Sequence, residues 1–300
     1  MTLRQVSYFV AIAEEGSLTL AARRLLVSQP SLSQQLRALE RDVGAKLLER
    51  TSRGVRLTAT GREFLPEARA LLAASRRARS AVSRTEVLEA GELEVATVRS
   101  LSVGVLPPLI GEFRHRHPGV RIWLKEFVHR DELCSALLAG NSDIAIAPRP
   151  RTWSGELRPL GWEEFVVIVP PQDPLADTRG PLSLRRLAER EWILYEPGHG
   201  LAEVVAFACA NAGFTPRPAI RTAQAEAAVR LAAAGVGVAM VPVNMVPEHL
   251  GHRAHRLRRR VVRELAAFTR TQFSPAADAF ATAAAAVAWP PRPARSVAFL

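Results

Sequence analysis

Residues 16–61 read GSLTLAARRLLVSQPSLSQQLRALERDVGAKLLERTSRGVRLTATG, and this segment carries the clearest structural signals in the amino-terminal part of the chain. Ser17 and Ser28 each stand directly before a helical pattern, where a side-chain oxygen can accept a hydrogen bond from the first turn. Pro30 lies in the first turn of the second pattern, where its missing N–H costs nothing. The stretch therefore predicts two capped helices joined by a short turn at residues 26 and 27.

The second of these helices, expected from about residue 29 to 42, has one apolar and one polar face. Leu32, Leu36 and Leu39 are spaced to share the buried face. Residues 47–61 then predict two short strands around a polar turn, which is a wing. The polar face carries side chains that can hydrogen-bond base edges in the major groove of DNA: Gln29, Ser31, Ser33, Gln34 and Arg37. A merely polar surface helix, or a winged helix that binds protein, is the alternative.

The net charge of +11 favours a polyanionic partner, although an arginine-rich composition can also reflect a GC-rich genome. The position of the charge is therefore more informative than its sum. Between Gly16 and Arg62 there are nine Lys or Arg residues and three acidic ones. The positive charge is concentrated where the helices and the wing are expected, so the charge and the helical pattern indicate the same surface.

The rest of the chain divides into three further parts. A helix is expected at residues 3–14, and a long helix after Gly61 repeats apolar residues every three or four positions, which suits a partner helix. From Gly91 onward, strand patterns alternate with helix patterns, which predicts an α/β fold in two subdomains.

The sequence also resembles the LysR-type transcriptional regulators. The similar segments include SQPSLSQQLRALE, ERT and LTATG, and later LEVATV, LLAGNSDIAIA, LAAAGVGVAMVP and SPAADAF. The resemblance implies an α/β protein overall, with a winged helix-turn-helix DNA-binding domain at residues 1–60 and a linker or dimerisation helix at 61–90. Residues 91–290 would form an effector-binding domain of two Rossmann-like subdomains, about 91–163 plus 266–290 and 164–265, resembling a periplasmic binding protein. The proline-rich residues 291–300 are expected to be a loosely ordered tail.

This organisation implies a regulator that binds double-stranded promoter or operator DNA as a homodimer or homotetramer and acts with RNA polymerase. Arg50 and Arg53 are expected to anchor the wing on phosphates, while the helix reads bases. The complete set of expected DNA-binding residues is Ser28, Gln29, Pro30, Ser31, Ser33, Gln34, Arg37, Arg50, Arg53 and Thr58.

A small-molecule effector is expected between the two subdomains, where strand-to-helix junctions expose unpaired N–H groups. By position, Ser100, Ser102, His129, Tyr195, His199 and Gln224 resemble the effector-contacting sites of the family. The nearby arginines and histidines favour a small anion, although each residue alone could be a helix cap or loop surface. The full expected set is Arg99, Ser100, Leu101, Ser102, His129, Arg130, Tyr195, His199, Gly200 and Gln224.

Two other classes of protein are disfavoured by the sequence. An enzyme is disfavoured because the sequence has no GxSxG, P-loop, Rossmann glycine or HExxH motif, and no cofactor is expected. A free solute-binding protein is disfavoured by the amino-terminal module and by the lack of an export signal. No stretch reaches the roughly 18 apolar residues of a membrane span, so a cytoplasmic protein without a membrane partner is expected.

The cysteines, a group of histidines and a basic run are three smaller features of the sequence. Cys134 and Cys209 lie far apart without a CxxC partner and are expected to be core residues. The histidines at 249, 252 and 255 recur every three residues, but no cysteine or carboxylate completes a metal site, so none is expected. The basic run 256–263 is interpreted as a solvated face.

Overall fold

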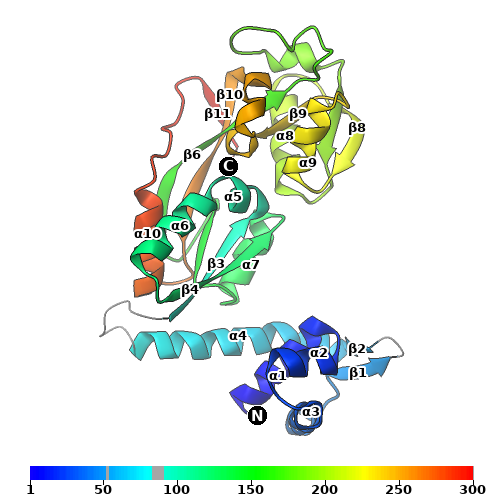
Figure 1. Cartoon of the computed structure of the whole chain (residues 1–300), viewed down its shortest axis with the longest axis vertical. Coiled ribbons are helices and arrows are strands. Elements are labelled where there is room, and N and C mark those ends of the chain that lie inside the picture. Colours follow the sequence, from blue (N-terminus) through cyan, green and yellow to red (C-terminus); the bar gives the residue numbers. More distant parts are fainter. Residues whose placement is uncertain (52–53, 83–90, 300) are drawn as a thin grey trace. The chain divides into compact units, whose positions relative to one another are not determined.

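The computed structural model describes residues 1–51, 54–82 and 91–299, which fall into two compact units (Figure 1). The first unit contains four helices and a two-stranded hairpin. Its elements are α1 (Leu3–Glu15), α2 (Leu18–Arg24), α3 (Gln29–Val43), β1 (Leu48–Thr51), β2 (Gly54–Leu57) and α4 (Ala59–Val82).

The helix starts follow the serine caps expected from the sequence. The Ser17 hydroxyl accepts a hydrogen bond from the Leu20 N–H, and the Ser28 hydroxyl accepts one from the Ser31 N–H. Both caps are thereby confirmed. The apolar faces of the helices meet in one core, which includes the fully buried side chains of Phe9, Ile12, Leu32, Leu39 and Leu47.

The wing is held against the helices by close backbone contacts. The Val55 N–H donates to the Gly16 carbonyl at 2.8 Å. A Cβ atom at Gly54, whose φ is 137°, would lie 2.5 Å from that carbonyl oxygen, so only glycine fits. At Gly61 a Cβ atom would lie 1.9 Å from the Leu47 carbonyl oxygen. These approaches give a physical reason for glycine at the start of β2 and in the first turn of α4.

The second unit is an α/β body built on a seven-stranded sheet of order β4-β3-β5-β10-β6-β9, with β11 added to β10. Its first half contains β3 (Gly91–Val98), α5 (Arg99–Gly104), α6 (Leu106–Arg116), β4 (Val120–Phe127), α7 (Arg130–Leu138), β5 (Ile144–Pro148) and β6 (Leu157–Ile168). The 3-10 helix η2 (Leu184–Leu187) follows, with β7 (Glu191–Tyr195), α8 (Gly200–Asn211), β8 (Arg217–Thr222), α9 (Ala225–Ala233) and β9 (Ala239–Pro242). The chain ends with the 3-10 helices η3 (Val243–Met245) and η4 (Glu248–Arg253), β10 (Ala254–Phe268), α10 (Pro275–Ala285) and β11 (Ser296–Ala298).

The long strands β6 and β10 join the two subdomains (Figure 1). They pair antiparallel from Ala254 opposite Ile168 to Phe268 opposite Leu157. The parallel strands β3, β4 and β5 extend the sheet at one end of this pair, and β9 extends it at the other. Two strands therefore cross from one lobe to the other, so movement between the lobes must bend or twist this pair.

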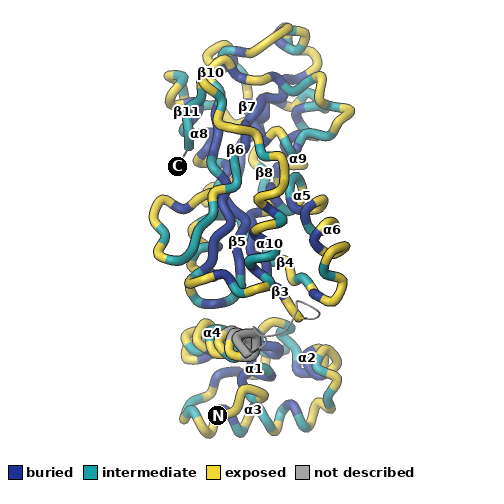
Figure 2. Tube along the Cα trace, turned by 90° about the vertical axis from the view of Figure 1, so that its left-hand side faces the viewer, coloured by how far each residue is buried: buried dark blue, intermediate teal, exposed yellow. Residues whose placement is uncertain are grey.

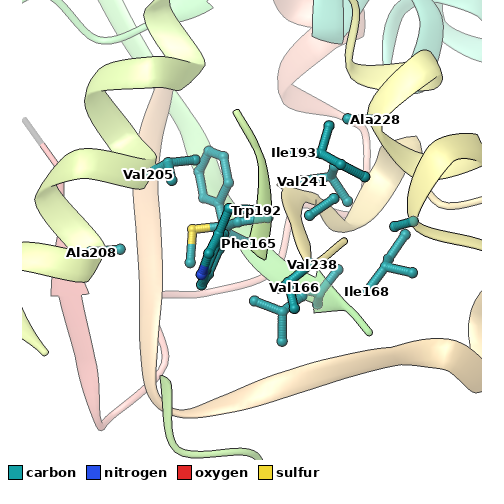
Figure 3. Packing of buried hydrophobic residues seen from close by; sticks show 14 of the residues in the cluster. Phe165, Val166, Ile168, Trp192, Ile193, Val205, Ala208, Ala228, Val238 and Val241 are labelled. Carbon is teal, nitrogen blue, oxygen red and sulfur yellow. The ribbon is translucent and has the colours of Figure 1, made fainter. Parts of the chain in front are cut away.

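Each subdomain has its own core. The strands β5 and β7 lie in the buried interior (Figure 2). In the second subdomain, Trp192 of β7 packs near Phe165 of β6 and Val205 of α8 (Figure 3). Separate apolar clusters fill the first subdomain on both faces of its sheet, around Phe113 and Phe280 and around Leu133 and Phe268. Cys209 is buried, as its expected core role requires, whereas Cys134 is half-buried.

The carboxyl-terminal tail differs from the expectation of a loosely held segment. Ser296–Ala298 forms β11, which runs parallel to β10 with Val297 opposite Val261. The Phe299 N–H donates to the Val262 carbonyl, and the Phe299 ring packs edge-on against Phe207 at 5.5 Å. Backbone pairing and the aromatic contact thus hold residues 296–299 against β10 and α8. Of the described helices, none is both long and apolar enough to cross a membrane.

Candidate DNA-binding and effector sites

The exposed face of α3 carries most of the side chains expected to contact DNA. Gln29, Gln34 and Arg37 are exposed, whereas Leu32 and Leu39 on the opposite face are fully buried. Amphipathic spacing therefore turns the polar residues outward. This face presents amide donors and acceptors together with a guanidinium group, which are the groups that read base edges and bind phosphate.

Other expected DNA-binding residues also have local structural roles. Arg37 donates to the Ser33 carbonyl and hydroxyl, both at 3.4 Å, so these two side chains form one polar group on α3. Ser28 caps the helix, and Pro30 and Ser31 lie in its first turn. Thr58 accepts from the Gly61 N–H at 2.9 Å and donates to the Lys46 carbonyl at 2.7 Å. Its hydroxyl thereby fixes the start of α4.

The structure describes only part of the two wing arginines, Arg50 and Arg53. The Arg50 backbone pairs with Val55 in the hairpin, while the Arg50 side chain and all of Arg53 lie outside the described residues. Two residues that the sequence reasoning missed, Arg41 and Lys46, line a hollow of about 920 Å³ beside Gln34 and Arg37. They add positive charge next to the expected reading face, although Lys46 is also paired with Glu40 at 2.8 Å.

A pocket between the two subdomains brings together six of the ten expected effector residues. Its cavity volume is about 30 Å³, which is enough for one or two water-sized groups. The six residues are Arg99, Ser100, His129, Arg130, His199 and Gly200. The sequence reasoning missed seven further lining residues: Val98, Val128, Pro148, Leu201, Glu203, Arg263 and Phe299.

Helix starts from both subdomains form the walls of this pocket, and each histidine caps its own turn. The His199 Nδ1 atom accepts from the Leu201 N–H at 3.1 Å, at the start of α8. The His129 Nδ1 atom accepts from the Asp131 N–H at 3.1 Å, beside the start of α7. Because each Nδ1 atom accepts a hydrogen bond, the proton of the neutral ring lies on Nε2.

Two direct contacts join the lobes at the pocket. The Gly200 N–H of α8 donates to the Val128 carbonyl at 3.2 Å, and the His129 Nε2 atom lies 3.2 Å from the Glu203 carboxylate. A backbone hydrogen bond and a close side-chain contact thus lie at the mouth of the pocket.

Arg263 is the main polar group that the sequence reasoning failed to identify. It lies in the basic run interpreted as a solvated face, but it is only 5% exposed. Its Nε atom donates to Glu163 at 2.5 Å, and one terminal nitrogen donates to the Ser100 hydroxyl at 3.0 Å. The interpretation was wrong at this position because β6 supplies a buried carboxylate for the arginine. Arg256, Arg258 and Arg259 are exposed, as expected of that run.

The wall of the pocket combines the positive charges of Arg99 and Arg130, the carboxylate of Glu203 and the side chain of His199. Burial lowers the pKa of His199, and the positive charges of Arg99 and Arg263 lower that pKa further. His199 is therefore a neutral hydrogen-bonding group at neutral pH, while Arg99 and Arg130 supply charge at the pocket wall.

Four expected effector residues do not line the pocket. Leu101 is fully buried in the core, and the Ser102 hydroxyl is bonded to Glu126 and to the Arg99 carbonyl. Tyr195 donates to the Met240 carbonyl at 3.1 Å and stacks on His199, with burial raising its pKa. Gln224 is exposed at the start of α9. Leu101 and Ser102 lie within α5, Tyr195 ends β7 and Gln224 caps α9, and their side chains do not line this pocket.

The histidines at 249, 252 and 255 do not share one helical face. His249 and His252 lie exposed on the 3-10 helix η4, while His255 is buried in β10. Across the part of the chain that the structure describes, no group of three or more His, Cys, Asp or Glu residues could hold a metal ion.

Comparison with known families assigns both parts of the chain. Residues 3–62 match the model of the "bacterial regulatory helix-turn-helix protein, lysR family", and residues 87–289 match the "LysR substrate binding domain". The transcriptional regulator AlsR of Bacillus subtilis is 34% identical over 245 residues, which cover 81% of this chain and 80% of that protein. The uncharacterized regulator YnfL of Escherichia coli is 32% identical, covering 81% of this chain and 82% of YnfL.

Solved structures show the same architecture. The structure of full-length CbnR complexed with its target DNA has a TM-score of 0.70 and 29% identity, covering 95% of this chain and 99% of that one. Full-length OxyR of Pseudomonas aeruginosa has a TM-score of 0.74 at 24% identity, with 96% of both chains covered, and supports the fold alone. The matched proteins are transcriptional regulators rather than enzymes. This chain belongs to the LysR family of transcriptional regulators, with an amino-terminal DNA-binding helix-turn-helix domain followed by an effector-binding domain.

Proposed function

We propose that this regulator binds specific promoter DNA through α3 and the wing, and that a small anion held between the two carboxyl-terminal subdomains switches that binding or its activating effect. The observation that carries the effector half of the proposal is the convergence of Arg99, Arg130 and Arg263 with two helix-capping histidines in one inter-lobe pocket. The exposed polar face of α3 is the observation that supports DNA binding.

For DNA, Gln29 and Gln34 are assigned to base edges, and Arg37 to a base or a phosphate. Arg50 and Arg53 are assigned to phosphates beside the wing. A homodimer or homotetramer would place two such domains on a pseudo-palindromic site, and RNA polymerase would be the partner at the promoter. Support comes from the residue types on the exposed face and from the relative CbnR, whose structure was solved with its target DNA.

For the effector, the pocket favours a compact carboxylate. The cavity of about 30 Å³ is smaller than such a molecule, so binding requires the lobes to move apart or the pocket wall to rearrange. An anion that binds one arrangement of the lobes more tightly shifts the population toward it, and a coupling of about 1–3 kcal/mol gives a clear regulatory response.

Genome-wide mapping of bound DNA, followed by mobility shifts on the mapped sites, tests the DNA half. We expect saturable binding to preferred sites, with log affinity falling steeply against log salt concentration as phosphate counterions are released. Gln29→Ala should cost about 1–3 kcal/mol at preferred sites and little on random duplex. Equal binding to every duplex would overturn the proposal that this chain recognises specific promoters.

A thermal-shift screen of small mono- and dicarboxylates tests the effector half, followed by footprinting with each compound that binds. The double variant Ser100→Ala with His199→Ala should lose the response while keeping effector-free DNA affinity, because neither residue lies in the helix-turn-helix unit. A carboxylate that binds this variant with unchanged affinity and an unchanged footprint shift would place the sensing site elsewhere.

A further inference from the structure

A second cavity in the effector domain is lined by arginines that form no ion pair within the described chain. It has a volume of about 240 Å³ and is distinct from the inter-lobe pocket, since the two share no lining residue. Its walls come from η2, the end of α8, β10 and the tail strand β11. The lining residues are Ser183, Leu184, Arg185, Ala208, Asn211, Ala212, Arg258, Arg259, Val261 and Val297.

The charge in this cavity is uncompensated. Among the described residues, no carboxylate lies within ion-pair distance of Arg185, Arg258 or Arg259. Glu164 of the paired strand β6 is already paired with Arg260 at 3.1 Å and with Arg256 at 3.9 Å. Three arginines thus line one hollow, and none of them forms an ion pair with a carboxylate of the described chain.

The positive surface continues beyond the cavity. An adjoining hollow of about 340 Å³ is lined by the same Arg258 and Arg259 together with Arg295 of the tail. Arg295 likewise has no acidic partner within the described ranges. Arg258 donates through Nε to the Pro181 carbonyl at 3.4 Å, so its stem is oriented while its terminal nitrogens stay available.

The floor of the cavity is apolar. Leu184 and Val261 are buried members of the second-subdomain core, and Val297 packs against that core from β11. An apolar floor beside several guanidinium groups suits a molecule with an apolar body and a doubly charged head, because guanidinium groups bind phosphate and carboxylate in a bidentate fashion. A concave wall of this kind favours a small molecule over an extended polymer.

We propose that this cavity is a second ligand site, separate from the inter-lobe pocket, for a small phosphate-bearing or dicarboxylate metabolite with an apolar portion. Arg185, Arg258 and Arg259 bind the charged head, and Leu184, Val261 and Val297 contact the body. Because β11 also carries the chain to Phe299 in the inter-lobe pocket, the ligand stabilises the tail that lines the first site.

Calorimetric titration of the full-length protein with phenyl phosphate, at fixed ionic strength, tests the proposal. We expect saturable binding that phenol, which lacks the phosphate, does not reproduce. Arg185→Gln combined with Arg259→Gln should weaken binding at least tenfold. The matched control is Arg114→Gln combined with Arg230→Gln, which removes the same charge from exposed helix positions and should leave the affinity unchanged.

Two further measurements distinguish binding in this cavity from binding in the inter-lobe pocket and from a general effect of charge. Ser100→Ala with His199→Ala should leave phenyl phosphate affinity unchanged, because those residues belong to the inter-lobe pocket, and failure of that pocket would not affect this result. If the two charge-matched double variants bound phenyl phosphate equally weakly, the loss of affinity would come from net charge alone, and the proposal would be overturned. Loss of random-duplex affinity in the Arg185 and Arg259 variant, without phenyl phosphate binding to the wild type, would assign the surface to nucleic acid and also overturn it.

Discussion

Arg263 and Glu163 form an ion pair whose side chains are about 6% and 1% exposed, respectively. Breaking such a pair by removing one partner leaves a buried charge, which costs about 3–5 kcal/mol. Arg263→Met should therefore lower the free energy of unfolding by that amount, measured by urea denaturation.

The double variant supplies the control for this prediction. Arg263→Met with Glu163→Gln leaves no buried charge, and the amide oxygen introduced at position 163 can still accept from Asn244, which now donates to Glu163 at 2.8 Å. We expect most of the lost stability to return, whereas the response to an anionic effector should stay lost. Equal destabilisation by the single and double variants would show that the cost arises from packing rather than from charge.

His199 gives the effector domain a pH dependence of defined sign. Burial lowers its folded-state pKa below the ordinary value of about 6.5, so the unfolded chain binds more protons in the interval between the two pKa values. Its neutral form is favoured in the fold, and stability should fall as pH drops below about 6.5 until the folded-state pKa is reached. Above that pH interval, His199 is neutral in both the folded and the unfolded chain, so its contribution to stability no longer changes with pH.

Urea denaturation between pH 5 and 8 checks the sign, with His199→Asn as the variant that cannot titrate. His255 is the internal comparison, because burial lowers its pKa as well and His255 should retain part of the slope in the variant. If the free energy of unfolding changed with pH equally steeply in the wild type and in His199→Asn, His199 would not contribute to the pH dependence.

At the scale of single elements, Glu40 joins α3 to the wing. Its buried carboxylate accepts from the Leu47 and Leu48 N–H groups at 3.0 and 3.3 Å, just where β1 begins. Glu40→Ala would leave both buried donors unpaired, at about 1–3 kcal/mol for each group. We expect a loss of stability in the helix-turn-helix unit, measured by thermal unfolding of the full chain.

Glu40→Gln separates hydrogen bonding from charge at the same position. The amide oxygen can still accept from both N–H groups, while the ion pair with the exposed Lys46 is lost. Such a pair is worth about 0–1 kcal/mol, so this variant should be much less destabilised than Glu40→Ala. Similar losses in both would contradict the assignment of the cost to the two backbone donors.

The elements that could be predicted from sequence are those specified by local signals. The caps at Ser17 and Ser28 and the apolar stripe of α3 depend on residues three or four positions apart, so the pattern alone located them. Arg263 depends on partners 100 and 163 positions away in the chain, and β11 on a pairing with β10. No periodicity within either segment reveals such contacts, which arise only when the strands come together.

At the scale of the whole effector domain, the two lobes are joined covalently at the sheet and non-covalently at the pocket. The strands β6 and β10 pass between the lobes, while the Gly200–Val128 backbone bond and the His129–Glu203 contact close the pocket mouth. An opening at this pocket would break the two mouth contacts and could keep the strand pairing. The opening that we propose for an effector larger than water would therefore bend or twist this pair of strands.

The tail is part of this closed arrangement, and its removal tests the whole domain. Val297 and Phe299 pack on the second-subdomain core, and Phe299 also lines the inter-lobe pocket. Ending the chain after residue 293 should lower the free energy of unfolding by about 1–3 kcal/mol through lost apolar burial, and should alter the affinity for whichever carboxylate the screen identifies. Phe299→Leu, which keeps the strand and an apolar side chain, is the matched control and should lose less. A loosely held tail would contribute neither apolar burial nor a pocket wall. If truncation left both the urea midpoint and the carboxylate affinity unchanged, the result would contradict an ordered β11. It would instead favour the loosely ordered tail expected from the proline-rich sequence.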